Sequence, residues 1–110
     1  MHLNAADKEN LANIKATIKA DIRLHYRIED LASMAFMSRS NLTKKYKAFY
    51  GISIYAELLQ TRLALARQEL ETTETPIKVI AKKCGFKYAC NFSIAFKARY
   101  GVRPREYRGI

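Results

Sequence analysis

The sequence predicts an all-α fold of about seven helices, with two helix-turn-helix subdomains joined by a long linker helix. Apolar residues recur at helical spacing, and no segment alternates apolar and polar residues as a strand would. One stretch of the chain also repeats another. The four glycines and two prolines separate the helical segments. The expected helices, in order, are about Ala6–Ile22, Ile28–Ala35, Arg39–Tyr50, Ile54–Glu71, Ile77–Cys84, Ala89–Tyr100 and Arg105–Tyr107.

Each helix is supported by apolar spacing or by a boundary residue. The first carries Leu11, Ile14 and Ile18 along one face. The third follows Ser38, whose hydroxyl can accept from a free backbone N–H in the first turn. The fourth is long and rich in leucine. The fifth and seventh follow prolines, whose missing N–H is harmless at a helix start. We therefore expect a first subdomain over residues 1–53, a linker helix over 54–72 and a second subdomain over 73–110.

Two segments of the chain match each other in register. Ile28–Ala35 matches Ile77–Cys84 at an offset of 49, and Leu42–Ile52 matches Phe92–Val102 at an offset of 50, so the second turn is one residue longer. Each copy is a short helix, a tight turn and a longer helix, with a small alanine where the two helices cross. A solenoid used for protein contacts is the alternative, but two copies are too few for one.

Charge is segregated along the chain. Twenty Lys and Arg against ten Asp and Glu give a net charge of +10, which implies an acidic polymer or surface as the partner. No acidic residue occurs in residues 31–56 or in residues 75–105, the two windows that hold the helix-turn-helix units. This segregation is typical of a phosphate-binding face.

The third helix has an inward and an outward face. Leu42, Tyr46 and Phe49 are expected to face inward. The opposite face is polar and basic, which suits base edges in a major groove: Lys44 could donate to guanine, and Thr43 could bond a base or touch a thymine methyl group. An ordinary solvated surface is the alternative. The expected base-contact residues here are Arg39, Ser40, Thr43 and Lys44.

The sixth helix has fewer polar groups on its outward face. Phe92, Phe96 and Tyr100 are expected to face inward, which leaves Ala89, Cys90, Ser93 and Ile94 as its base-contact candidates. We expect this unit to read A·T-rich sequence or DNA shape and mainly to anchor phosphates. The expected DNA-backbone contacts are Lys47, Arg62, Lys78, Lys87, Lys97, Arg103 and Arg105.

Catalytic and metal sites are not expected. The two histidines, His2 and His25, have no plausible partners, and no phosphate-loop or metal-ligand spacing occurs, so we expect no enzyme, metal or cofactor. Cys84 is expected in the core. Cys90 is expected to be a passive small residue, with a redox switch on DNA binding as the alternative. No signal peptide or membrane-spanning run is apparent, so a cytoplasmic protein is expected.

From about Ile18 to Arg108 the chain resembles the AraC family of bacterial transcription regulators. The resemblance includes Leu31-Ala32 and Arg62-Leu63, but its strongest part is C-terminal. That part comprises Pro76-Ile77, Ile80-Ala81, Gly85-Phe86, Asn91-Phe92-Ser93, Phe96-Lys97, Gly101-Val102, Pro104 and Tyr107-Arg108.

The resemblance implies sequence-specific binding to double-stranded DNA, with the linker helix holding two recognition helices in successive major grooves. Family base-contact positions fall on Ser40, Thr43 and Lys44, and then on Ala89, Cys90, Ser93 and Ile94. RNA polymerase is an implied partner, as is an effector or dimerisation domain outside this chain. A helix-turn-helix protein-interaction module and a sequence-neutral architectural DNA binder are the alternatives.

The chain departs from the family pattern at several positions. Ile94 stands where members often carry Arg, and Ala89 and Cys90 stand where polar residues are common, so the resemblance implies weak base readout by the sixth helix. Phe36 stands in the first turn opposite Gly85. If that position requires a positive φ, Phe36 would be strained by about 1–2 kcal/mol.

Overall fold

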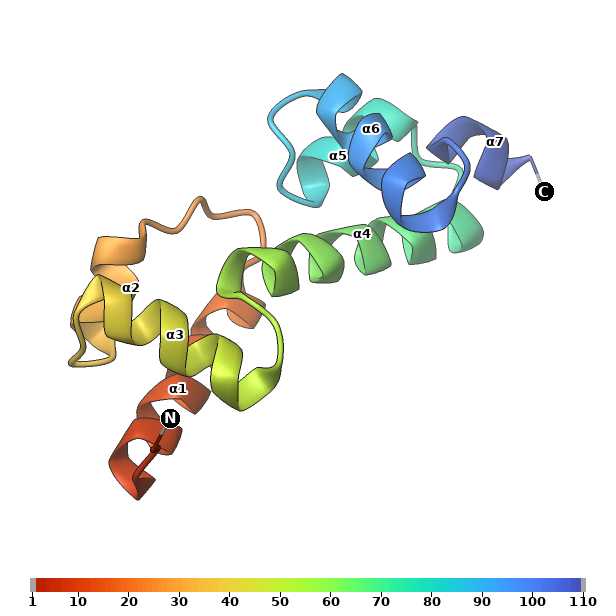
Figure 1. The fold of residues 1–110 in the computed structure, drawn as a ribbon. Coiled ribbons are helices and arrows are strands. Elements are labelled where there is room, and N and C mark those ends of the chain that lie inside the picture. The colour runs from red at the N-terminus through yellow and green to blue at the C-terminus, as the bar shows by residue number, and fades with distance from the viewer. Residues whose placement is uncertain (1, 110) are drawn as a thin grey trace. The chain divides into compact units, whose positions relative to one another are not determined.

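The computed structural model describes residues 2–109 and divides into two compact units, Met1–Leu59 and Gln60–Ile110. The boundary between them lies inside the longest helix. Within the described residues there are seven helices and no strands (Figure 1), which confirms the expected all-α fold. The helices are α1 (Ala5–Ala20), α2 (Ile28–Met34), α3 (Arg39–Tyr50), α4 (Ile54–Thr72), α5 (Ile77–Lys83), α6 (Ala89–Tyr100) and α7 (Pro104–Arg108).

Helix α1 begins and ends at polar caps. Asn4 accepts a hydrogen bond from the Asp7 N–H at 2.7 Å, and the Asp7 carboxylate accepts one from the Asn4 N–H at 3.4 Å. The expected end at Ile22 was two residues too late, because Asp21 is extended with φ −147°. The hydroxyl of Tyr26 lies 2.7 Å from the carbonyl oxygen of Asp21 and 3.0 Å from that of Thr17, so its single proton can donate to a carbonyl oxygen at the helix end.

The first unit packs α1, α2 and α3 around one apolar core, to which the first turns of α4 contribute (Figure 1). The largest fully buried side chain of this unit is that of Tyr46 on α3. The small Ala32 of α2 is buried in this core, and α2 contacts α3. The other buried members are Leu11, Ile14, Ile18, Leu31, Ala35, Leu42, Ile54 and Leu58.

One charged residue, Glu57 of α4, is buried beside this core and ties three helices together. Its carboxylate accepts a short hydrogen bond from the Tyr46 hydroxyl of α3, and Lys15 of α1 lies 2.9 Å away. Burial alone would raise the pKa of Glu57, but the bonds from Tyr46 and Lys15 and the charges of Lys15 and Lys19 outweigh it, so the pKa is lowered. Burial raises the pKa of Tyr46, and the hydrogen bond to the Glu57 carboxylate and its negative charge raise it further. At neutral pH, Glu57 is therefore a charged carboxylate that is held by the neutral phenol of Tyr46 and the ammonium of Lys15.

The second unit repeats the arrangement with the later part of α4, α5, α6 and α7. Phe92 and Phe96 of α6 are fully buried, and Cys84 lies in the same core, as predicted. Burial raises the pKa of the Cys84 thiol to about 11, so this thiol is protonated and unreactive at neutral pH. The hydroxyl of Tyr107 donates to Glu71 of α4, which holds α7 against the core.

The two turns inside the units have the same backbone geometry. The N–H of Met37 donates to Ala32 at 3.0 Å, and the N–H of Phe86 donates to Ala81 at 2.9 Å. Phe36 has φ 56° and Gly85 has φ 96°, so the position does require a positive φ, and Phe36 is the strained residue that the sequence comparison anticipated. The extra residue expected in the second turn is present, between Lys83 and Ala89.

Candidate nucleic-acid interface

Helix α3 presents a polar face to solvent in the first unit. It starts at Ser38, whose hydroxyl oxygen accepts from the Asn41 N–H at 3.1 Å and caps the helix as predicted. It ends at Gly51, which has φ 74°. Leu42 and Tyr46 anchor the opposite side in the core. The outward residues are thus carried on a rigid element with both ends fixed.

The four expected base-contact residues of this helix are exposed and line one groove. The groove has a volume of about 590 Å³ and lies entirely within the first unit. Thr43 donates its hydroxyl to the carbonyl of Arg39 at 2.9 Å, which leaves its methyl group and its lone pairs for an outside partner. The lining residues are Arg39, Ser40, Thr43 and Lys44 of α3 with Ile28, Ser53, Ile54 and Tyr55.

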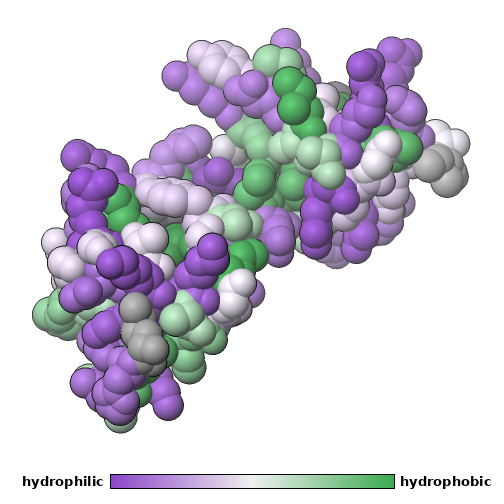
Figure 2. Space-filling view, in the orientation of Figure 1, coloured by the Kyte–Doolittle hydropathy of each residue, from purple (hydrophilic) through white to green (hydrophobic). Residues whose placement is uncertain are grey.

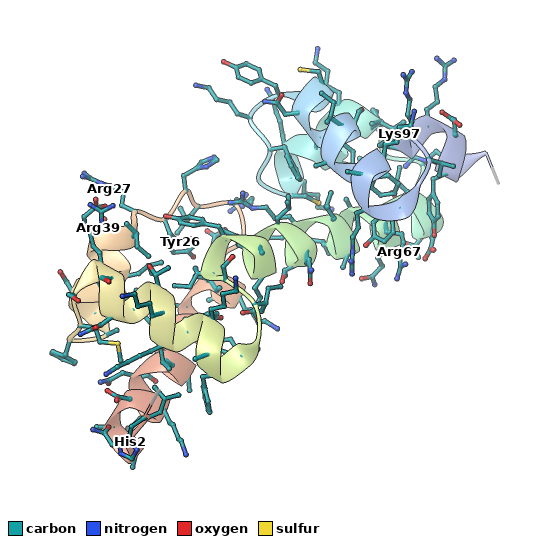
Figure 3. All side chains as sticks on the ribbon, viewed as in Figure 1. His2, Tyr26, Arg27, Arg39, Arg67 and Lys97 are labelled. Carbon is teal, nitrogen blue, oxygen red and sulfur yellow. The ribbon has the colours of Figure 1, made fainter. Side chains whose placement is uncertain are left out.

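Charge near this groove is only partly compensated. Glu29 of α2 lies 3.3 Å from Arg39 and 3.9 Å from Arg27, and Figure 3 shows these two arginines near each other. Lys44 and Lys47 are exposed and form no ion pair with any residue in the 2–109 range. An anion approaching α3 would therefore meet two uncompensated ammonium groups.

Not every cation of the acid-free windows is available to an outside anion. Lys45 donates to Asp7 of α1 at 3.1 Å, and Lys83 donates to Glu69 of α4 at 2.8 Å. Both acids lie outside the windows in sequence and reach them only through folding. The remaining lysines and arginines define the basic surface more narrowly than the sequence alone did.

Helix α6 presents a different surface. Ile94 is 70% exposed, Cys90 is exposed, and Tyr88, the residue before the helix, is 55% exposed. Ala89 is half-buried against the core, and Ser93 is also half-buried. On the face of the second unit that Figure 2 shows, hydrophobic side chains reach the surface among hydrophilic ones. Cys90 and Ile94 are thus the exposed members of the expected base-contact set on this helix.

The expected phosphate contacts lie at the surface with one exception. Arg62 on α4 is half-buried. Lys97 of α6 projects from the second unit (Figure 3), and the ammonium of Lys87 lies 5.5 Å from the centre of the Tyr88 ring. The exposed residues of this set are Lys47, Lys78, Lys87, Lys97, Arg103 and Arg105.

The expected inward position of Phe49 was wrong. Its side chain is 39% exposed, while Tyr50 is half-buried and packs on Tyr46 at a ring-centre distance of 4.7 Å. Helical periodicity allows either Phe49 or Tyr50 to face inward at the end of α3. The ammonium of Lys15 lies 4.1 Å from the centre of the Tyr50 ring and stabilises the inward position of Tyr50. Tyr100 occupies the equivalent place on α6, half-buried against Phe96 at 4.7 Å.

Sequence reasoning missed three residues that the structure adds to the two faces. Asn41 and Asn91 are exposed beside the expected base contacts, and Tyr55 of α4 forms a wall of the groove while donating to the Tyr26 carbonyl at 2.9 Å. The recurrence of asparagine at an offset of 50 was a signal for the first two. Nothing local in the sequence marks Tyr55, because the groove forms only when α4 begins beside α3.

The arrangement presents polar and basic side chains that suit binding to an anionic partner. Among residues 2–109 no three His, Cys, Asp or Glu side chains are grouped so as to hold a metal ion. No helix in that range is long and apolar enough to cross a membrane. Each unit instead offers one exposed helix, supported by a shorter helix across a tight turn. These features define a tandem helix-turn-helix module, the class that places the second helix of each unit against DNA.

Comparison with known proteins identifies the family. Residues 31–110 match the family model described as "Helix-turn-helix domain". The chain belongs to the AraC family of transcriptional regulators, and its fold is that of the family's DNA-binding domains.

Two curated relatives and two solved structures illustrate the similarity. The chain is 29% identical over 102 residues to the probable transcriptional regulator LumQ of Photobacterium leiognathi, covering 93% of the chain and 41% of LumQ. It is 35% identical over 106 residues to the HTH-type transcriptional regulator AlkR of Acinetobacter baylyi, covering 96% of the chain and 35% of AlkR. The chain thus spans well under half the length of these relatives.

Among structures, the chain matches the DNA-binding domain of AdpA, described as a global transcriptional factor and solved in complex with a target DNA. The TM-score is 0.84 at 26% identity, over 91% of this chain and 90% of that one. An AraC-type regulator from Chromobacterium violaceum matches with a TM-score of 0.81 at 29% identity, over 96% and 95% of the two chains.

Proposed function

We propose that this chain binds specific sequences in double-stranded DNA and serves as the DNA-reading part of a bacterial transcription regulator. In this proposal α3 and α6 enter successive major grooves of one duplex, with residues 54–72 as the linker between two helix-turn-helix subdomains. The module binds and performs no catalytic step. Family membership and the DNA complex of AdpA support the proposal.

The observation that carries the proposal is the outward face of α3. Lys44 and its neighbours are exposed, are carried by a helix capped at both ends, and lie in a window of sequence free of acids. A polar and basic helix face of this kind fits a major groove about 12 Å wide. The surrounding lysines and arginines suit the phosphates on either side.

We propose base contacts by Arg39, Ser40, Thr43 and Lys44 in the first unit and by residues of α6 in the second. Their exposure supports this for all four residues of α3 and for Cys90 and Ile94, whereas Ala89 and Ser93 are only half-exposed. Proposed phosphate contacts come from the exposed cations. Arg62 is also proposed as a phosphate contact, but less of its side chain can reach a phosphate because the residue is half-buried.

The test begins with selection of bound sequences from a random DNA library. Binding of the chain to the selected duplex and to a scrambled duplex is then measured at several salt concentrations. We expect a steep fall of affinity with salt on both, and an affinity ratio of about 10³ or more in favour of the selected duplex. Equal affinity with a steep salt slope would instead show a sequence-neutral binder. No binding to either would favour a protein-interaction module.

Further partners are proposed for the regulator as a whole. The curated relatives are more than twice as long as this chain, which leaves room for an effector or dimerisation domain. We propose RNA polymerase as a second partner, because another similar protein, RclR of Escherichia coli, is described as a transcriptional activator. Such a regulator would act in the bacterial cytoplasm, at the chromosome. Deletion of the regulator should lower expression from a reporter promoter that it activates, and this measurement tests the proposed role in activation.

A further inference from the structure

Helices α3 and α6 can be compared position by position within one chain. Both are 12 residues long, and both end at a glycine in the left-handed region, Gly51 with φ 74° and Gly101 with φ 84°. Their inward residues correspond at an offset of 50, with Leu42 and Tyr46 matched by Phe92 and Phe96. Each outward residue of α3 therefore has a counterpart at the same place on α6.

Some outward pairs are identical in the two helices. Asn41 matches Asn91 and Lys47 matches Lys97, and all four are exposed. The DNA backbone presents the same phosphate groups at every major groove, whereas the base edges change with sequence. Residues that are the same in both units therefore suit contacts to phosphates. This inference rests on the proposed function of DNA binding.

Two of the outward pairs that differ become less polar in α6, whereas Thr43 is matched by Ser93, which keeps a hydroxyl group, and the exposed Phe49 is matched by Arg99. Ser40 is replaced by Cys90, and Lys44 is replaced by Ile94. The first unit offers hydroxyl and ammonium groups at these places, while the second offers a thiol and a branched aliphatic side chain that is 70% exposed. Core packing in the second unit does not explain Ile94, because the core-facing positions of α6 are Phe92 and Phe96.

The residue before each helix follows the same trend. Ser38 caps α3 through the Asn41 N–H, whereas Tyr88 makes no side-chain cap bond within the described part of the chain. A capping residue normally stabilises a helix end. Position 88 instead holds a ring that is 55% exposed, with the Lys87 ammonium 5.5 Å from its centre. An exposed aromatic has thus replaced a stabilising hydroxyl at the start of α6.

We propose that α6 recognises the C5-methyl groups of thymines in the major groove through Ile94, Cys90 and Tyr88, while Asn91 and Lys97 hold the flanking phosphates. The thymine methyl is the apolar group that standard base pairs present in that groove. Ile94 cannot form the bidentate hydrogen bonds that guanine or adenine requires, but it can bury a methyl group. One buried methyl group changes Kd by about four-fold.

The experiment replaces each thymine of the selected duplex, one at a time, by deoxyuridine, which lacks only the methyl group. Kd for the chain is expected to rise about four-fold at one or two thymines. In the Ile94→Ala variant, the ratio of the deoxyuridine Kd to the thymine Kd should fall to about one at the thymine that Ile94 contacts, while a thymine contacted by Cys90 or Tyr88 keeps its ratio. The matched control is Lys44→Ala, the same position on α3, which should leave the ratio at about four. Circular dichroism and thermal unfolding check that both variants are folded.

A second variant makes α6 resemble α3. Ile94→Lys places an ammonium where Lys44 stands in the first unit, and repeated library selection should shift the preferred base at the affected position from thymine towards guanine. An unchanged preference would count against the proposal.

The measurements distinguish a failure of DNA recognition from a failure of thymine-methyl recognition alone. Recovery of no preferred sequence would overturn both DNA recognition and this inference. A selected duplex that binds tightly but tolerates deoxyuridine at every thymine would overturn the inference alone. The same holds if Ile94→Ala keeps the wild-type sensitivity to deoxyuridine at every thymine.

Discussion

Phe36 occupies the left-handed backbone region with φ 56°, in the turn where the second unit carries Gly85. A residue with a Cβ atom is strained there by about 1–2 kcal/mol. The ring gains nothing in return from packing, because it is 85% exposed. The strain is therefore uncompensated within the described residues.

Phe36→Gly should raise the free energy of unfolding by roughly 0.5–1 kcal/mol. Relief of strain outweighs the greater conformational entropy that glycine has in the unfolded chain. Urea denaturation of both proteins measures the difference. Gly85→Ala is the opposite control and should destabilise, because φ is 96° at that position. A less stable Phe36→Gly variant would show that the ring has a stabilising contact.

Lys44 is the residue of α3 that the proposed readout uses most directly. It is exposed, lines the groove and forms no ion pair with a residue the structure describes. Lys44→Ala should reduce discrimination at one or two base pairs by about 1–3 kcal/mol, because a donor to guanine is lost. Binding to duplexes with single base-pair changes measures this. A uniform loss across all duplexes would show that Lys44 contacts a phosphate instead.

At the scale of the helix, Glu57 explains how α3 is held in place. Its carboxylate joins Tyr46 of α3 and Lys15 of α1 to α4, and Lys15 also lies over the Tyr50 ring. The recognition helix of the first unit is thus fixed by a charged network, while Phe96 of α6 occupies the place of Tyr46 and carries no hydroxyl. The second unit therefore lacks this hydrogen bond at the matching position of α6.

The stability of the first unit should fall in acid through Glu57. Its pKa is lowered from the usual 4.5, so the contribution to stability is complete above that value and is lost as pH falls through the lower, folded value. Thermal unfolding between about pH 6 and pH 2.5 should show this loss.

Glu57→Gln should be less stable at neutral pH by about 1–3 kcal/mol, because the Lys15 ammonium loses its partner. It should also lose less stability in acid than the wild type does. Tyr46→Phe is a useful comparison, since it removes the hydroxyl and keeps the ring. Identical acid profiles for wild type and Glu57→Gln would mean that other carboxylates dominate acid unfolding.

At the scale of the whole molecule, two acid-free windows supply the basic surface on which DNA binding rests. Folding brings acids to Arg39, Lys45 and Lys83 and leaves the other cations of these windows without an acidic partner among residues 2–109. Arg103 is one of the latter, exposed at the start of α7, where it makes no side-chain cap bond. It can be removed with little effect on the fold.

Arg103→Ala should weaken binding to every duplex alike and reduce the slope of log affinity against log salt by about one, as expected for the loss of one phosphate contact. Titrations of the selected and the scrambled duplex at four or more salt concentrations measure both quantities. A change in the preferred sequence, with the slope unaltered, would contradict the assigned role.

The sequence by itself determined the order and type of the helices, the tandem repeat and the family. Apolar spacing and caps act over a few residues, so the bounds of α3 and α6 and the inward positions of Tyr46 and Phe96 could be predicted locally. The positive φ at Phe36 was anticipated for the same reason, from its match to Gly85.

Only the tertiary structure decided which side chains remain available at the surface. The exposure of Phe49, the pairing of Lys45 with Asp7, the burial of Glu57 and the wall that Tyr55 adds to the groove all depend on helices distant in sequence. Helical periodicity gives the direction of a side chain from its own axis, but a neighbouring helix determines whether that direction leads to solvent, to a counter-charge or into the core.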